Sequence, residues 1–223
     1  MSIDSEVIDR IFGINVKGIE RVLLQEGMKQ NPKGDRDSWG RNLHDGHQTW
    51  VGLHPQTLQT SYAEIVEIIK ILAPRPDQHF LDLGAGYGRI GLVLHALCAG
   101  CSFTGIEYVQ ERVTEGNRIF KKLDCVNARL IQGDLSHSRY LLSCADYFFL
   151  YDFGNSKEIQ SSLQQLKEVT GKLPIKMIAR GDATRHFVHK EHPWLSAIYQ
   201  PLHAKNYSIY SNFEDISPAA TLF

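Results

Sequence analysis

The sequence lacks most features that would place it among membrane, nucleic-acid-binding or repetitive proteins. It has no run of 18 apolar residues, so we expect no membrane-spanning helix. Its formal net charge is only −1, which gives the whole molecule no attraction to nucleic acid or to an anionic membrane and leaves room only for a local basic patch. Internal repeats and low-complexity tracts are also missing. The 43% apolar content is that of a globular protein with a sizeable core.

Cysteine is scarce, with four residues at positions 98, 101, 125 and 144. Cys98 and Cys101 form a C-x-x-C pair, which could indicate redox chemistry or half of a zinc site. No second C-x-x-C follows, and small buried thiols are common at the end of a helix and the start of a strand, where this pair falls. We interpret the pair as core residues and predict no metal site. Three loop histidines match no zinc spacing either: His44, His47 and His54.

The N-terminal part predicts two helices and a long loop. Its first residues, MSIDSEVIDRIFG, are acidic early and have no long apolar core, so we expect no signal peptide and a cytoplasmic location. Apolar residues recur at helical spacing on both sides of Gly13. The stretch from Lys29 to His54 has no apolar period but contains Trp39 and Trp50, which favours either a flap over a site or an ordered surface loop. We assign residues 1–58 to a helical extension with this aromatic loop.

Residues 59–223 predict the main domain. A helix is expected over 61–72, with Ser61 and Glu64 as a capping box. Five apolar strands are expected at 79–83, 102–106, 128–131, 146–151 and 175–179, each followed by a helical pattern, and two further strands flank 203–206. This alternation predicts an α/β fold, a doubly wound, mostly parallel seven-stranded sheet with an antiparallel C-terminal edge pair.

The most informative stretch is HFLDLGAGYGRIG, which runs from His79 to Gly91. An apolar strand leads into a turn with glycines at 84, 86, 88 and 91, and a helix follows. Glycine accepts positive φ and lets ligand atoms approach the backbone, while the first turn of the helix offers unpaired N–H groups. The stretch therefore predicts a site for a nucleotide-like ligand.

The phase of the glycines and the preceding acid discriminate between nucleotides. Gly86, Gly88 and Gly91 spell the G-x-G-x-x-G dinucleotide fingerprint, which alone is a weak signal for an NAD-dependent oxidoreductase. Asp82, however, stands where a pyrophosphate would meet a carboxylate, and a cation suits that position better. The segment from Asp82 to Gly88 resembles the D/E-x-G-x-G-x-G signature of class I S-adenosylmethionine-dependent methyltransferases. The resemblance covers roughly residues 60–210 and implies S-adenosyl-L-methionine as cofactor.

This resemblance implies roles for the residues of the turn. Asp82 would hold the amino group of the cofactor's methionine end, and the backbone from Gly84 through Ala85 and Gly86 to Gly88 would follow the cofactor. Glu107 ends the second strand 19 residues after Gly88. An acid near that offset accepts the ribose hydroxyls in nucleotide-binding βαβ units; the alternative is a solvated charge.

Three residues beyond the second and third strands complete the predicted cofactor site. Tyr108 directly follows Glu107 and is assigned to the cofactor. Gly133 and Asp134 follow the third strand, and the resemblance implies that a Gly-Asp there caps the adenine. Asp134 could also cap the helix expected after it, and the two roles are compatible.

The fourth strand ends in Tyr151, Asp152 and Phe153. Ligands of open α/β sheets sit beyond the carboxyl ends of the strands, so these residues should border the transferred methyl group. Asp152 is the candidate for orienting or deprotonating an acceptor, with a cap of the next helix as the alternative. The rings of Tyr151 and Phe153 could stabilise a cationic amine by about 0.5–2 kcal/mol.

A second, narrower resemblance concerns QTSYAEI at residues 59–65. This segment is similar to the T-x-G-E-type segment of non-SET protein-lysine methyltransferases, which implies cofactor contacts for Thr60 and Tyr62. In that family an asparagine stands where this chain has Asp152. The Asn/Asp-Pro-Pro-Tyr/Phe signature of base and glutamine amino methylation is absent.

The sequence thus predicts a methyltransferase that acts on a protein lysine or another amine. Three alternatives stay open: a small-molecule methyltransferase, a non-catalytic cofactor-binding module that holds a partner protein with its aromatic loop, and an NAD-dependent oxidoreductase.

Overall fold

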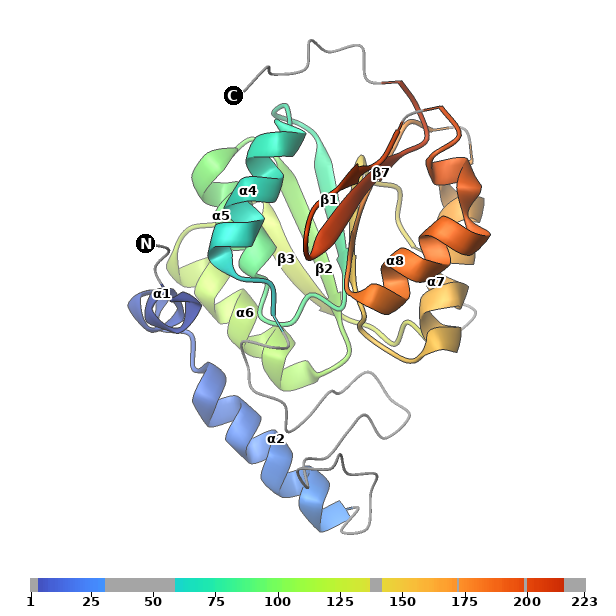
Figure 1. The fold of residues 1–223 in the computed structure, drawn as a ribbon. Helices are drawn as coiled ribbons and strands as arrows, with labels where there is room; N and C mark the ends of the chain where they lie inside the picture. Colours follow the sequence, from blue (N-terminus) through green and yellow to red (C-terminus); the bar gives the residue numbers. More distant parts are fainter. Residues whose placement is uncertain (1–3, 31–58, 137–141, 172, 199, 215–223) are drawn as a thin grey trace.

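A seven-stranded sheet forms the centre of the protein, with strand order β3-β2-β1-β4-β5-β7-β6 (Figure 1). The computed structural model describes residues 4–30, 59–136, 142–171, 173–198 and 200–214. The strands are β1 (His79–Leu83), β2 (Ser102–Glu107), β3 (Ala128–Gln132), β4 (Tyr147–Tyr151), β5 (Lys176–Arg180), β6 (Leu202–His203) and β7 (Tyr207–Ser211). The five strands β1 to β5 are parallel to one another, and β7 runs antiparallel to both β5 and β6. The predicted α/β fold is confirmed.

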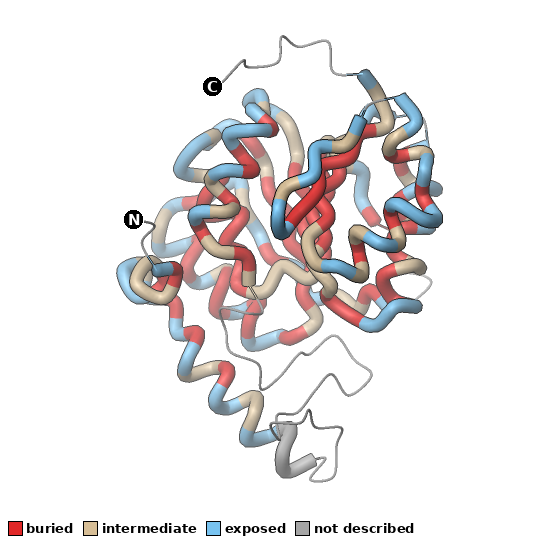
Figure 2. Tube along the Cα trace, in the orientation of Figure 1, coloured by how far each residue is buried: buried red, intermediate tan, exposed pale blue. Residues whose placement is uncertain are grey.

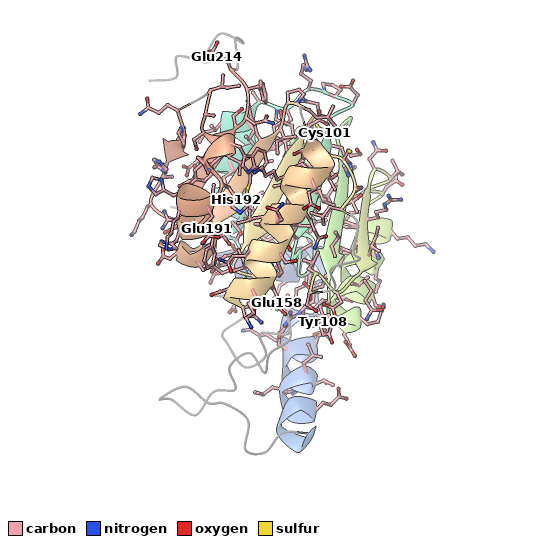
Figure 3. The ribbon with its side chains drawn as sticks, turned by 90° about the vertical axis from the view of Figure 1, so that its right-hand side faces the viewer. Cys101, Tyr108, Glu158, Glu191, His192 and Glu214 are labelled. Carbon is pink, nitrogen blue, oxygen red and sulfur yellow. The ribbon has the colours of Figure 1, made fainter. Side chains whose placement is uncertain are left out.

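Chain order reverses at β1, which pairs with β2 on one side and with β4 on the other. β4 reads YFFLY, and Phe148 and Leu150 are fully buried, as expected for a central parallel strand that is covered on both faces. The crevice that such a switch point leaves at the carboxyl ends of the strands is where open α/β sheets bind ligands. This edge is the lower one in Figure 3, where Tyr108 lies, and Cys101 marks the opposite edge.

Helices cover both faces of the sheet (Figure 1). The helices α4 (Tyr62–Leu72), α5 (Arg89–Leu97) and α6 (Gln110–Lys122) lie on one face, and α7 (Ser156–Thr170) and α8 (Asp182–Glu191) on the other, followed by the 3₁₀ turn η1 (Pro193–Leu195). Alternate residues of β1 serve two separate apolar cores: Phe80 packs with the first group of helices, and Leu81 with the second. Figure 2 shows the buried strands between the more exposed helices.

Local signals fix several helix ends. Ser61 caps α4 by accepting from the Glu64 backbone N–H at 3.2 Å. The second half of the predicted capping box is not formed. The Glu64 carboxylate accepts from Arg180 and from Asn206 instead. Leu97, the last residue of α5, is 48% exposed.

Two N-terminal helices, α1 (Ser5–Phe12) and α2 (Val16–Gln30), are present as predicted, joined at Gly13 in a left-handed conformation. The inward face of α1 carries polar side chains as well as apolar ones: Ser5 and Asp9 are buried, Ile8 and Phe12 pack against the core, and Ile11 is 70% exposed. Asp9 faces inward because it pairs with the buried guanidinium of Arg89, as described below. α2 projects beyond the carboxyl edge of the sheet (Figure 1). Most of the predicted aromatic loop, with its histidines and tryptophans, lies outside the described residues.

The thiols and the helices raise two further points. All four cysteines are free, and Cys101 is buried, with its Sγ 3.2 Å from the carbonyl oxygen of Arg75. Burial raises the pKa of the Cys101 thiol to about 12, which makes it a poor nucleophile.

Across the ranges that the structure describes, no helix is long and apolar enough to cross a membrane, and no group of three or more His, Cys, Asp or Glu residues is placed to hold a metal ion.

Candidate functional site

The glycine turn after β1 is held tightly against β2 and β4. The backbone N–H groups of Gly84 and Ala85 both donate to the carbonyl of Ile106, at 2.9 Å. Gly84 has φ +86°, and a Cβ atom built there would lie 2.4 Å from the Cβ of Phe153. Only glycine satisfies both conditions, so the first glycine of the motif is required by packing.

The second glycine of the turn is less confined, because an added Cβ would meet its nearest neighbour only at an ordinary van der Waals distance. Gly86 has φ +56°, and the atom nearest to an added Cβ would be the Cγ of Gln59, at 3.8 Å. Its backbone N–H donates to Oε2 of Glu107 at 2.9 Å. The turn is therefore bonded to Glu107, and Gly86 also lines the hollow described next.

A hollow opens beside this turn at the switch point of the sheet. It encloses about 330 Å³, including space open to solvent. Six of the predicted site residues line it: Thr60, Asp82, Gly84, Ala85, Gly86 and Tyr151. The remaining lining residues are Gln59, Ile65, Arg89, Ile90 and Phe149. The structure thus brings together the turn, the acid before it, the segment before α4 and the end of β4.

Asp82 is the chemically unusual residue of the hollow. It is 5% exposed, and no residue in the described part of the chain forms a hydrogen bond or ion pair with its carboxylate. Burial, and secondly the neighbouring charge of Glu107, raise the pKa of Asp82 well above its usual value. A buried carboxylate without a partner is costly. A cationic group in the hollow would supply the missing partner.

Glu107, at the end of β2, is 4% exposed and is held by backbone groups. Its Oε2 accepts from Gly86, and its Oε1 accepts from the backbone N–H of Val109 at 3.0 Å. Nη1 of Arg112 lies 3.4 Å from the same Oε1. The structure therefore fixes this carboxylate next to the glycine turn, and its ribose contact stays a prediction.

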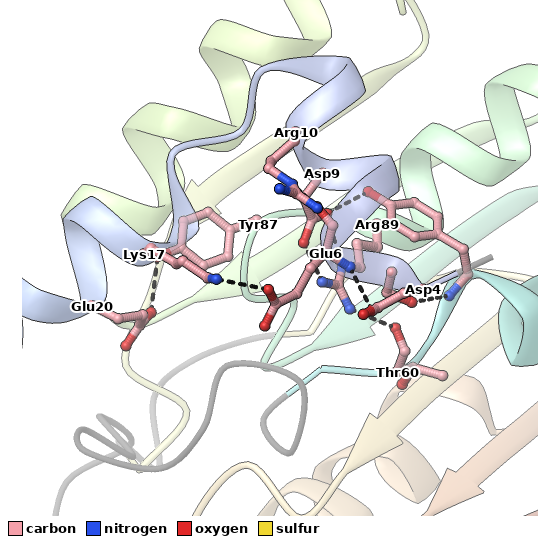
Figure 4. A network of polar contacts seen from close by, with 11 residues as sticks. Asp4, Glu6, Asp9, Arg10, Lys17, Glu20, Thr60, Tyr87 and Arg89 are labelled. Carbon is pink, nitrogen blue, oxygen red and sulfur yellow. Dashed lines mark hydrogen bonds and ion pairs between the residues drawn. The ribbon is translucent and has the colours of Figure 1, made fainter.

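The N-terminal helices reach this region through two buried ion pairs. Both carboxylate oxygens of Asp9 on α1 accept from Arg89, the first residue of α5 (Figure 4). Both oxygens of Glu20 on α2 accept from Arg112, at 2.9 and 3.0 Å. The extension is thus bonded directly to residues that flank the hollow and Glu107.

Thr60 and Tyr62 occupy different places. Thr60 lines the hollow, and its carbonyl accepts from Nη1 of Arg89 at 3.1 Å. Tyr62 points to α1: its hydroxyl donates to Asp9 at 2.9 Å, and the Arg89 guanidinium lies 5.0 Å from its ring centre. Tyr62 does not line the hollow, so its predicted contact with the cofactor is replaced by a contact with the N-terminal helix.

The predicted adenine residues lie beside Glu107. The backbone N–H of Gly133 donates to the Glu107 carbonyl at 3.0 Å. Asp134 accepts from the backbone N–H and from the hydroxyl of Ser136, at 2.8 and 2.6 Å, and so closes a local turn. The segment after Ser136 lies outside the described residues, so the alternative of a helix cap is not tested. Tyr108 is half-buried at the same edge (Figure 3).

The end of β4 places its three residues in three environments. Tyr151 lines the hollow, and the Arg180 guanidinium lies 4.0 Å from its ring centre. Phe153 is 4% exposed and packs in the apolar core against Gly84. The prediction that the Phe153 ring faces the methyl group therefore does not match its position, because the chain turns inward under the glycine turn.

Asp152 caps a helix, as the alternative to a role at the acceptor predicts, but the helix is α8 and not α7, which follows it directly. Its Oδ1 accepts from the backbone N–H and the hydroxyl of Thr184, both at 2.8 Å, and its Oδ2 accepts from the backbone N–H of Ala183 at 3.3 Å. These donors belong to the first turn of α8, whereas Asn155 caps the next helix, α7. Three of about four acceptor positions are used, which leaves little capacity to take a proton from an acceptor.

Comparison with solved structures identifies the fold. Precorrin-6y C5,15-methyltransferase from Geobacter metallireducens GS-15 matches with a TM-score of 0.56 and 14% sequence identity, over 73% of this chain and 93% of that one. The C-terminal domain of the precorrin-6Y C5,15-methyltransferase from Rhodobacter capsulatus gives 0.53 and 18%, over 71% and 91%. TrmN from Thermus thermophilus gives 0.54 and 11%, over 68% and 48%. This chain has the class I methyltransferase fold.

These likenesses establish the fold alone, because the identities are low. The alignment with TrmN spans about half of the length of that chain. No family model and no curated protein sequence matches this chain. What this methyltransferase-like chain binds and transfers must therefore be argued from its own residues.

Sequence reasoning missed four charged residues that the methyltransferase fold buries near the hollow: Asp9, Glu20, Arg89 and Arg112. A faint signal existed. Asp9 follows Ile8 directly and Glu20 follows Ile19, so each falls beside a residue of the predicted apolar face. A charge beside such a face can mean a buried ion pair, but only the folded chain shows its partner.

Proposed function

We propose that this protein is an S-adenosylmethionine-dependent methyltransferase. The observation that carries the proposal is Asp82, a buried carboxylate without a described partner at the wall of a hollow under a three-glycine turn. S-adenosylmethionine brings an ammonium group that can pair with this carboxylate. The fold supports the proposal, since the matched structures described above are named as methyltransferases in two of three cases.

The residues around the hollow fit this cofactor. Asp82 would accept from the ammonium group, and the open side of Gly86 would let the cofactor lie against the backbone. Glu107 would accept from the ribose, with Tyr108, Gly133 and Asp134 next to the adenine. Thr60 would lie near the methionine end, because it lines the same hollow as Asp82. When bound, the cofactor supplies a methyl group on a sulfonium, which is the electrophile of the reaction.

The chain itself would act mainly by alignment. Transfer of a methyl group needs the acceptor atom in line with the carbon–sulfur bond, and holding the two reactants together supplies much of the rate. Tyr151, Ile65 and Phe149 are among the apolar and aromatic residues that line the hollow, where they would exclude water and orient the acceptor. Asp152 acts on this wall indirectly, because it fixes the end of β4 to α8.

The surroundings of Tyr151 and Phe153 bear on the class of acceptor. The predicted preference for a protein lysine or another amine relied on free aromatic faces at Tyr151 and Phe153. One of these rings is in the core, and the other already carries the Arg180 guanidinium. Cation–π attraction therefore gives no support to an amine over a neutral small molecule. We propose that the acceptor binds beside Tyr151, with protein amines and small molecules as the two classes to test.

Two measurements test this function. Calorimetry with S-adenosylhomocysteine and with NADH should show binding of the first and not of the second; the reverse would favour an oxidoreductase. Transfer of tritiated methyl from S-adenosylmethionine into a cell lysate, separated into protein, nucleic acid and small-molecule fractions, then identifies the acceptor class. Cofactor binding with no counts in any fraction would favour a non-catalytic binding module.

A further inference from the structure

Glu20, on the N-terminal helix α2, is a junction between three parts of the molecule. It is 9% exposed. Its Oε1 accepts from the hydroxyl of Tyr87 at 2.8 Å and from Nε of Arg112 at 2.9 Å, while its Oε2 accepts from Nη2 of Arg112 at 3.0 Å. Tyr87 lies inside the glycine turn, and Arg112 lies on α6. The Glu20 side chain therefore bonds both to Tyr87 in the glycine turn and to Arg112, which contacts Glu107.

The guanidinium of Arg112 is shared unequally between two carboxylates. It makes two hydrogen bonds of normal length to Glu20, but only one long contact, of 3.4 Å, to Oε1 of Glu107. Arg112 is 6% exposed, so it cannot turn to solvent instead. Of these two carboxylates, Glu20 therefore makes the closer contacts with Arg112, and Glu107 makes the longer one.

This unequal sharing matters because Glu107 has few acceptor positions left. A carboxylate offers about four lone-pair positions, and the N–H groups of Gly86 and Val109 use two of them. Arg112 lies against a third. A ribose presents two hydroxyl groups, so at least one of them must share Oε1 with Arg112. A closer, two-pronged contact of Arg112 with Glu107 would exclude the ribose.

We propose that Glu20 is a positioning residue for the ribose of the cofactor: it draws Arg112 away from Glu107 and so keeps that carboxylate available. The proposal rests on the function proposed above, and it assigns the N-terminal extension a part in cofactor binding. Asp9 and Arg89 make the same kind of link between α1 and the hollow (Figure 4), but Arg89 does not contact Glu107 in any described interaction.

The test compares two ligands in Glu20→Gln. The amide keeps the size of the side chain and can still accept from Tyr87, but it loses the charge that holds Arg112. We expect S-adenosylhomocysteine to bind about tenfold more weakly by calorimetry. An analogue in which hydrogen replaces both ribose hydroxyls should bind the variant and the wild-type protein equally, because it makes no contact with Glu107 that can be lost. Glu26→Gln, on the exposed side of the same helix, is the matched control and should change neither affinity.

The outcomes separate the two proposals. If the wild-type protein does not bind S-adenosylhomocysteine, the cofactor assignment is wrong, and this inference is wrong with it. If the wild-type protein binds but Glu20→Gln binds equally well, only the role of Glu20 is wrong. Equal weakening of both ligands would mean that Glu20 merely supports the fold, which also overturns the inference.

Discussion

Replacing Asp82 by asparagine tests the candidate site most directly. The amide has nearly the shape of the carboxylate but cannot pair with an ammonium group by charge. In the ligand-free protein Asp82 has no described partner to lose, so the substitution breaks no hydrogen bond that the structure records. It removes a group that burial and Glu107 disfavour in its charged form.

The magnitude follows from the kind of contact. A hydrogen bond to a charged partner contributes about 1.5–3 kcal/mol, which corresponds to an affinity loss of about 10- to 150-fold for S-adenosylhomocysteine. The melting temperature of the ligand-free protein should stay unchanged or rise, since an unpaired buried charge is unfavourable. Loss of affinity without loss of stability separates a binding role from a structural one.

The assay combines calorimetry with melting curves in the presence and absence of S-adenosylhomocysteine. Glu111→Gln is a suitable control, because Glu111 is exposed in the first turn of α6 and its substitution removes the same charge. An unchanged affinity in Asp82→Asn would remove this residue from the cofactor site. A fall in the melting temperature of the ligand-free variant would show that the carboxylate stabilises the fold, contrary to its unpartnered burial.

Three further predictions concern pH, the cap and the turn. The pKa of Asp82 is raised in the free protein, and an ammonium ligand favours the charged form of this carboxylate, so binding of the ligand should release a proton. The affinity for the ligand should therefore rise with pH until the raised pKa is passed. Calorimetry in buffers of different ionisation enthalpy would detect the released proton, and Asp82→Asn should release none. Asp152→Ala should cost about 1–2 kcal/mol of stability, seen in urea unfolding, through loss of the cap of α8, and a variant of full stability that no longer transfers methyl would instead support a chemical role. Gly84→Ala should unfold at a clearly lower urea concentration than Gly86→Ala, because only the first forces a Cβ against Phe153; equal midpoints would contradict the packing argument.

The sheet and the turn could be predicted because their signals are local. The apolar run of β4, the glycines that follow Asp82 and the offset of Glu107 each lie within one βα unit. These patterns predict the mostly parallel seven-stranded sheet, its antiparallel C-terminal edge pair and the position of Asp82 directly before the turn. Such patterns predict a strand, a turn or a helix without any knowledge of which distant segments pack against it.

The remaining residues depend on partners far away in the chain. Asp152 was assigned to the acceptor, but its donors lie 31 and 32 residues later, on α8. Tyr62 was assigned to the cofactor, but it meets Asp9, 53 residues earlier. Phe153 is predicted to border the methyl group because it follows the carboxyl end of the fourth strand, but its ring packs in the core. No periodicity distinguishes these alternatives, since only tertiary packing decides them.

The buried ion pairs also bear on where the chain can be divided. The sequence suggests a boundary at residue 58, yet a chain that begins at residue 59 would leave Arg89 and Arg112 without Asp9 and Glu20. Breaking a buried pair from one side costs about 3–5 kcal/mol, and two such losses approach the 5–15 kcal/mol that holds a typical domain together. We therefore expect α1 and α2 to belong to the same folding unit as the sheet, so that a chain shortened to residues 59–223 would lose stability.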